Sequence, residues 1–287
     1  MSAVATEPER GLDRPAAARG PRKRWTRFVL PGYVTAFILY LCFPIFIIIL
    51  FSFNQTRGGF GTSPRVKTTW LGFTGEWYSR LFELPDLTAS LRHSLTVAFA
   101  SALAATVLGT LLGLALARHR FRGRGTSDFV IFLSISAPEI VLGAALASFF
   151  VSLGLPRGLG TLILSHTMFS IAFVTVTVRA RAAGLDPSLE AAAMDLGAGP
   201  ATAFVKVTLP LLAPGILAGF LLAFALSMDD FVISQFTQGP ATMFPTWVFG
   251  STRVGIPPHV FAFATIIFVT GATLALALAL AQRRRRA

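Results

Sequence analysis

Six long apolar runs dominate this sequence, and each is long enough to cross a lipid bilayer as a helix. They lie at roughly 28–51, 94–117, 128–153, 159–179, 212–235 and 259–282. At 1.5 Å per residue, about 20 helical residues cover a hydrocarbon core of about 30 Å. The runs lack the two-residue alternation of a membrane barrel, and an open sheet would leave unpaired amides in lipid. The sequence therefore predicts an all-α integral membrane protein with six transmembrane helices.

The composition excludes a soluble enzyme and a nucleic-acid-binding domain. Only 13% of the residues are charged and 54% are hydrophobic, whereas soluble domains carry about 25% charged residues. The formal net charge is +12, but the basic residues form short clusters beside the apolar runs. Such clusters set membrane topology and contact anionic lipids.

The basic residues also predict the orientation of the chain. The 25 Lys and Arg residues divide 18 to 7 between the two sides of a six-span chain. The larger group precedes the first run, separates the second from the third and the fourth from the fifth, and follows the sixth. The positive-inside rule places that side, with both termini, in the cytoplasm. We expect residues 1–24 to be a disordered cytoplasmic tail and residues 25–287 to be the transmembrane domain.

A helical pair is predicted between the fourth and fifth runs, in residues 185–210, hereafter the coupling segment. Asp186 can cap a helix that Pro187 begins, and Gly197 can end it in a left-handed conformation. Pro200 then begins a second short helix, which we expect to end before Pro210. A partly apolar helix pair outside the membrane is suited to docking in a groove of another protein.

The coupling segment resembles the EAA signature of ATP-binding-cassette (ABC) importer permeases. That signature reads E-A-A, three residues, G, nine residues, then I-x-L-P. The matching residues are Glu190, Ala191, Ala192, Gly197, Val207, Thr208, Leu209 and Pro210. Val207 in place of isoleucine is the one departure, and it conserves apolar character.

Outside this segment the chain is most similar to the PotC-type permeases of spermidine/putrescine importers. The resemblance is carried by Asn54, Trp77-Tyr78, His93 to Thr96, Arg120 to Gly123, Leu226 to Asp230 and Gly239-Pro240. It implies a type I (MetI-like) permease fold and a place in the bacterial inner (plasma) membrane. It also implies three kinds of partner: a second permease, a cytoplasmic ATPase dimer and an extracytoplasmic substrate-binding protein. The ATPase cleft would receive the coupling segment, including Asp195.

Catalytic chemistry is not expected from this chain. It contains no G-x-x-x-x-G-K-[ST] motif and no G-x-S-x-G motif. We therefore expect ATP to be bound by partner subunits, and no cofactor here. The single Cys and four His residues show no metal-ligand spacing, so no metal site is predicted.

Three acidic residues within the apolar runs are candidates for the substrate pathway. A charge at membrane depth costs at least about 2.5–3.5 kcal/mol and usually serves a function. Glu139 lies about 16 Å into the third run, near its middle. Asp229 and Asp230 lie late in the fifth run, and because successive helical residues point about 100° apart, both cannot face one pathway equally. We interpret these acids as sites for a cationic substrate; a helix cap or a pair with a partner arginine is the structural alternative.

Weaker candidates accompany these acids. His166 either lines the pathway or is a hydrogen-bonded structural histidine. Pro138 interrupts the third helix, and the carbonyls that it frees either bind ammonium groups or mark a packing kink. Trp247 and Phe249, in the expected outer loop after Gly239-Pro240, are candidates for an external gate.

The sequence thus predicts the permease subunit of an ATP-driven polyamine importer, in which this chain forms half of the translocation pathway. Two alternatives stay open. The same class of importer can carry another small solute, such as an opine, a phosphonate or iron. A stand-alone secondary carrier would need no ATPase at all.

Overall fold

The computed structural model describes residues 26–55, 70–254 and 258–284, and these residues form helices joined by short connections. The all-α prediction is therefore confirmed. The predicted tail 1–24 lies outside the described residues. The chain divides into two compact units, residues 1–50 and 51–287. Helix α1 (Thr26–Phe51) corresponds to the first apolar run and forms the described part of the first unit.

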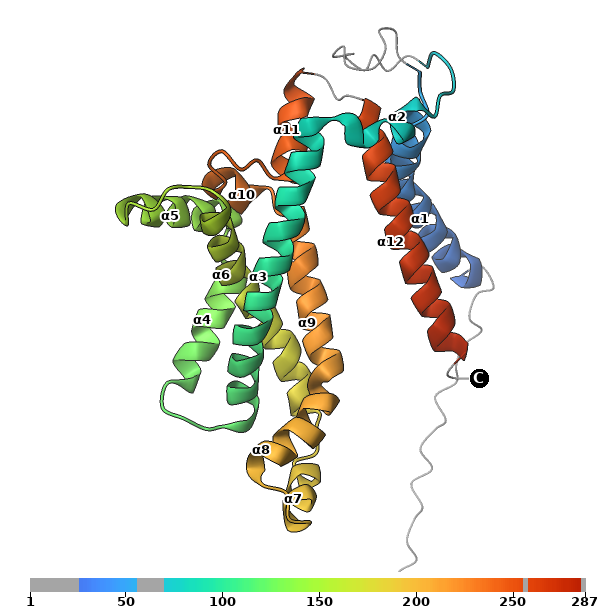
Figure 1. Ribbon diagram of the computed structural model, residues 1–287. Coiled ribbons are helices and arrows are strands. Elements are labelled where there is room, and N and C mark those ends of the chain that lie inside the picture. The colour runs from blue at the N-terminus through green and yellow to red at the C-terminus, as the bar shows by residue number, and fades with distance from the viewer. Residues whose placement is uncertain (1–25, 56–69, 255–257, 285–287) are drawn as a thin grey trace, which may run out of the picture. The chain divides into compact units, whose positions relative to one another are not determined.

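The second unit is built on three long helices that pack side by side (Figure 1). They are α3 (Pro85–Arg118), α6 (Leu159–Ala183) and α9 (Leu209–Asp229). Small residues line their contacts: a Cβ added to Gly109 would lie 2.7 Å from Cβ of Val174, and one on Gly219 would lie 3.1 Å from Cγ1 of the same valine. Glycines permit this close approach because they have no side chain, and such packing holds the helices together because lipid supplies no hydrophobic drive for their association.

Replacing Gly113 with alanine is expected to destabilise the protein. The new Cβ would lie 2.9 Å from the carbonyl oxygen of Thr175, and backbone cannot rotate away as a side chain can. Overpacking of this kind costs about 1–3 kcal/mol. Melting of the detergent-solubilised protein should show a lower Tm. The matched control is Gly125→Ala in α4 (Arg124–Ser136), where no atom lies within 4 Å. Equal Tm values for the two variants would contradict the prediction.

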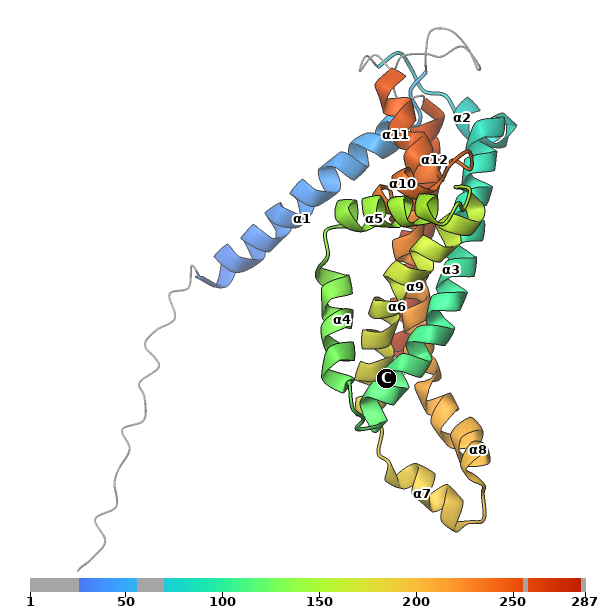
Figure 2. The same cartoon turned by 90° about the vertical axis from the view of Figure 1, so that its left-hand side faces the viewer.

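The third apolar run forms two helices and not one continuous span. Helix α4 ends at Ser136 and α5 (Glu139–Ser152) leaves it at a bend of 106°, visible in Figure 2. The break lies at Pro138, whose ring and missing N–H disfavour a continuous helix. Glu139 is consequently the first residue of α5 and is exposed. The sequence predicted the interruption, but its placement of Glu139 along a straight helix is wrong.

The fifth apolar run also ends earlier than predicted. Helix α9 stops at Asp229, and α10 (Val232–Thr237) begins after a two-residue break. Helix α11 (Phe244–Val254) follows the turn at Gly239-Pro240. Trp247 therefore lies in a helix and not in a loop, and the prediction of an outer loop there is wrong.

The fourth and sixth runs are close to their predicted limits, as α6 and as α12 (Pro258–Arg284). Among the described residues, four helices are long and apolar enough to cross a membrane, or five if α4 and α5 count as one broken span. In α12, Pro258–Thr273 is a shorter apolar helix by the same test. The second run extends further back than predicted, because α3 has 34 residues.

The start of the second unit covers one end of α3 and α12. Two short helices, α2 (Glu76–Ser79) and the 3₁₀ helix Leu81–Glu83, place Trp77 against Leu87 and Phe263. The indole N–H of Trp77 donates to the carbonyl oxygen of Asn54 at 2.9 Å. This contact fixes the segment that leads out of the first helix.

Candidate functional site

The coupling segment folds into the predicted helix, turn and helix. Helix α7 (Ser188–Asp195) starts one residue later than expected, and the Asp186 carboxylate accepts a bond from the Ser188 amide at 2.9 Å. Gly197 follows α7 with φ of +91°, a conformation that costs other residues about 1–2 kcal/mol. The second helix, α8, spans Pro200–Ala203.

The predicted end of the second helix before Pro210 is wrong. A five-residue π-helical turn, Phe204–Thr208, joins α8 directly to α9, and Pro210 lies in the first turn of α9. A proline inside a helix clashes with the carbonyl four residues earlier, and a π turn widens the helix at that point. The coupling segment is therefore continuous with α9.

Glu190 of the EAA signature is held by two side chains from other elements. Its Oε2 accepts hydrogen bonds from Arg118, at the end of α3, and from Oγ1 of Thr208, at 2.9 Å. The Arg118 guanidinium, followed by the Thr208 hydroxyl, lowers the pKa of Glu190 below its usual value. We call these three residues the Glu190 anchor. The anchor ties α7 to α3 and to the π turn.

The Glu190 anchor should keep its stabilising effect at pH values where an ordinary glutamate becomes protonated. A carboxylate with a depressed pKa contributes stability above its unfolded pKa and loses it only as pH falls through the folded value. Glu190→Gln should therefore increase local opening at neutral pH about two- to fivefold, as for a partly exposed ion pair. The rate of tryptic cleavage after the exposed Lys206 measures that opening.

The variant-to-wild-type ratio of cleavage rates corrects for trypsin's own pH dependence. It should stay constant through the ordinary range of glutamate pKa values and fall toward one only below it. A ratio of one at neutral pH would contradict the anchor. Asp195→Asn, on the same helix, serves as the control, because Asp195 is exposed.

The rest of the coupling segment presents an apolar surface. Leu196 is 91% exposed, and Leu189, Met194 and Val205 are also exposed. The other residues predicted for ATPase coupling are exposed as well: Ala191, Ala192, Asp195, Gly197, Leu209 and Pro210. Figure 1 places α7 and α8 beyond the end of the α3–α6–α9 bundle. Several exposed apolar side chains on one short segment, more than any single leucine, are typical of a protein-docking surface.

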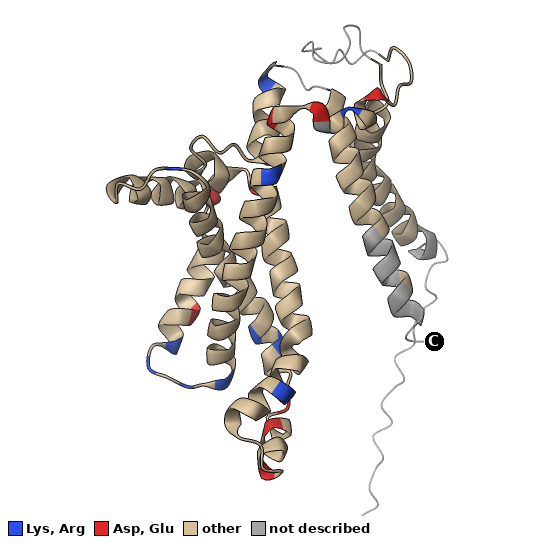
Figure 3. Ribbon diagram, viewed as in Figure 1, with Lys and Arg blue, Asp and Glu red and all other residues tan. Residues whose placement is uncertain are grey.

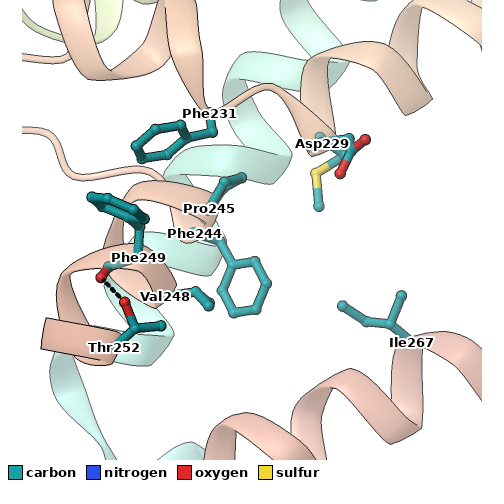
Figure 4. A pocket seen from close by; sticks show the side chains of 9 residues that line it. Asp229, Phe231, Phe244, Pro245, Val248, Phe249, Thr252 and Ile267 are labelled. Atoms are coloured by element: carbon teal, nitrogen blue, oxygen red, sulfur yellow. Dashed lines mark hydrogen bonds between the residues drawn. The ribbon is translucent and has the colours of Figure 1, made fainter. Parts of the chain in front are cut away.

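A second candidate site is a pocket of about 550 Å³ at the other end of the bundle. Its lining residues come from the end of α9, the break after it, α11 and α12: Met228, Asp229, Phe231, Phe244, Pro245, Val248, Phe249, Thr252 and Ile267 (Figure 4). Asp229 is the one charged side chain of these nine. The rings of Phe231 and Phe249 lie 4.6 Å apart, and the guanidinium of Arg253 lies 5.1 Å from the Phe249 ring centre.

An acid beside aromatic rings is suited to a cation. The carboxylate supplies charge, and the negative face of each ring attracts ammonium or guanidinium groups. The stacking of Arg253 on Phe249 is an example within the chain. The chemistry of this pocket therefore favours a cationic ligand over an anionic one.

Asp229 and Asp230 occupy different surroundings. Asp229 is exposed, whereas Asp230 is 8% exposed. The Asp230 carboxylate accepts bonds from the amides of Ile233 and Ser234, at 3.3 and 2.8 Å, which caps α10. It also lies 3.5 Å from Nε2 of the buried His166. The geometry of Asp230 matches the structural alternative considered for these acids.

The structure does not bring all the predicted pathway residues together. Glu139 and Trp247 are absent from the pocket lining. Trp247 is half-buried, between Phe244 and His259, with ring centres at 6.5 and 5.8 Å. His166 lies in the core of the bundle.

Several residues at these sites were missed by sequence reasoning. Arg118 gave no signal, because it is 72 positions from Glu190. Phe231 and Phe244 are ordinary members of a chain with 27 phenylalanines. Ser227 and Ser234, which bond to His166, could have been found, since buried hydroxyls in an apolar run need partners.

Two relatives are similar to this chain over most of its length. The chain is 40% identical over 252 residues to the "Spermidine/putrescine transport system permease protein PotC" of Escherichia coli (strain K12), covering 88% of this chain and 92% of that protein. It is 39% identical over 236 residues to the "Putrescine transport system permease protein PotI" of the same organism, covering 79% and 81%.

The fold has known relatives as well. A chain from the crystal structure of a bacterial ABC transporter involved in the import of the acidic polysaccharide alginate superposes with a TM-score of 0.65 at 17% identity. The match covers 91% of this chain and 96% of that one. At this identity the match establishes the fold alone, that of an ABC importer permease. Residues 105–287 match the family described as "Binding-protein-dependent transport system inner membrane component". This chain belongs to that family of membrane permeases.

Proposed function

We propose that this chain is one of two permease subunits of an ATP-driven importer of polyamines such as spermidine and putrescine. The observation that carries the substrate class is the pocket at the end of α9, with one carboxylate, Asp229, among aromatic side chains. Its chemistry agrees with the names of the two Escherichia coli relatives. A polyamine carries several ammonium groups, and a carboxylate can replace water around one of them.

The coupling segment is the proposed docking site for a cytoplasmic ATPase dimer, which binds the ATP. Leu196 and its apolar neighbours supply the docking surface, and the Glu190 anchor passes movement to α3 and to α9. A second permease completes the pathway, and an extracytoplasmic protein delivers the substrate. Glu139, exposed at the start of α5, is the proposed second carboxylate on the pathway.

The charge distribution supports a bacterial plasma-membrane location with both termini in the cytoplasm. Figure 3 places many of the Lys and Arg residues near α7, α8 and the turn between α3 and α4. That end carries Arg118, Arg120, Arg122, Arg124, Arg179, Arg181 and Lys206. An excess of basic residues favours the cytoplasmic side.

Uptake of radiolabelled spermidine tests the proposal. The chain is expressed together with the ATPase, second permease and binding protein of its importer in cells that lack polyamine uptake. We expect uptake that unlabelled spermidine and putrescine compete away, and that ends when ATP is depleted with the proton gradient intact. Competition by an opine, a phosphonate or ferric iron in their place would reject polyamines. Uptake that follows the proton gradient would reject the ATP-driven class.

A further inference from the structure

A buried polar network surrounds His166 at the centre of the second unit. Nδ1 of His166 lies 2.7 Å from Oγ of Ser227 on α9, and Nε2 lies 3.1 Å from Oγ of Ser234 on α10. Ser101 of α3 donates to Ser227 at 3.3 Å, and Ser234 donates to the Asp230 carboxylate at 3.1 Å. We call these five residues the His166 network. Its three serines are 0% exposed and His166 is 1% exposed.

The hydrogen bonds of the network run in one direction. The Ser101 hydroxyl has two acceptors at 3.3 Å, Ser227 and the carbonyl oxygen of Ala98, and with either one the Ser227 hydroxyl is free to donate to Nδ1 of His166. The assigned tautomer then carries its proton on Nε2 and donates to Ser234, which donates to Asp230. Two backbone amides complete the shell of that carboxylate. Such a directed chain leaves no donor unpaired and ends on the one negative charge.

The network spans the break between α9 and α10. Ser227 precedes the break, Ser234 follows it, and the His166 ring lies between them on a third helix, α6. Asp230 is the first residue of the break. Because the two ring nitrogens point to opposite sides, one side chain fixes both helix ends. A helix interrupted within a membrane needs partners of this kind for its backbone and its charges.

We propose that His166 is a positioning residue that fixes the α9–α10 break and thereby directs Asp229 into the pocket. Asp229 and Asp230 are adjacent, so holding Asp230 inward leaves its neighbour to face the pocket. His166 acts through the helix ends and not by touching the substrate. The role of Asp229 rests on the proposed function, whereas the fixing of the break does not.

Cysteine reactivity tests the fixing of the break without any transport measurement. The chain has one cysteine, Cys42, so Cys42→Ser gives a cysteine-free background. Ile233, in the first turn of α10, is 0% exposed and packs in a core with Leu146 and Phe169. Ile233→Cys therefore introduces a single thiol into this chain, and labelling of this chain reports whether α10 stays in place. The whole importer is used, in membranes, with a water-soluble thiol reagent.

We expect the thiol introduced by Ile233→Cys to be protected when His166 is present. In His166→Leu it should react at least about tenfold faster, the effect of losing one or two buried hydrogen bonds on local opening. His166→Asn and His166→Gln, whose amides lie near the Nδ1 and Nε2 positions respectively, keep one contact each and should give intermediate rates. They also cover the case in which His166→Leu does not fold.

The matched control is Ser170→Ala, one turn along α6. Its hydroxyl is buried and has no hydrogen-bond partner among the described residues. This variant removes a buried polar atom outside the network, so the introduced thiol should stay protected. Equal protection in His166→Leu and in Ser170→Ala would overturn the proposal.

Transport kinetics test the second step. In the His166 variants, the spermidine concentration for half-maximal uptake should rise about tenfold, because Asp229 is displaced from its position. A fall in maximal rate alone, in proportion to the amount of protein in the membrane, would overturn this step. If the wild-type importer takes up no polyamine, the proposed function fails, and cysteine reactivity still decides whether His166 fixes the break.

Discussion

Glutamate in place of Leu196 is expected to abolish uptake while the permease stays folded in its membrane. Leu196 is 91% exposed after the last turn of α7, so it contributes nothing to the packing of the chain itself. In the proposed complex it is buried in the ATPase cleft. Burying an unpaired carboxylate there should weaken docking by about 2–4 kcal/mol, or about thirty- to a thousandfold.

Two measurements separate loss of docking from loss of folding. Co-purification of the ATPase with the permease should fail, whereas the Tm of the permease alone should equal that of the wild type. Leu196→Met keeps an apolar side chain of similar size and should retain uptake. Full activity of Leu196→Glu in an assembled complex would show that the ATPase does not dock on this surface.

The coupling segment was predicted well because its signals are local. Asp186, Gly197 and Pro200 each act on their own backbone, and the structure places a cap, a left-handed turn and a helix start at these residues. Pro210 was misread because a π turn, which has no sequence signature, lets the helix continue. The Glu190 anchor was not predictable, since it joins residues that only the tertiary fold brings together.

The apolar runs predicted where the helices lie in the sequence, but not how those helices are oriented in the fold. Pro138 predicted a break, yet the bend of 106° depends on what α5 packs against, including α10. The same limit applies to Asp229 and Asp230. Helical periodicity predicted that the two could not face one pathway equally. In the structure Asp230 is the capping residue, through the amides of Ile233 and Ser234.

Asparagine in place of Asp229 is therefore expected to reduce polyamine uptake more than any other single change in the pocket. Asparagine keeps the shape of the side chain and removes its charge, and the remaining lining residues are uncharged. A charge-assisted hydrogen bond to an ammonium group contributes about 1.5–3 kcal/mol, so transport efficiency should fall about ten- to a hundredfold. Asp229→Glu restores the charge and should recover much of the loss.

The substrate series makes this prediction more specific. If Asp229 binds a single ammonium group, Asp229→Asn should reduce the uptake of spermidine and of putrescine by similar factors, because each molecule offers one such group to the pocket. Asp230→Asn should act on folding and not on substrate binding. Because Asp230 is buried, this change weakens the cap of α10 and lowers the amount of folded protein. Normal uptake by Asp229→Asn at normal membrane levels would contradict the assignment of the pocket. The carboxylate that binds the substrate would then have to be another one, and Glu139 would be tested first.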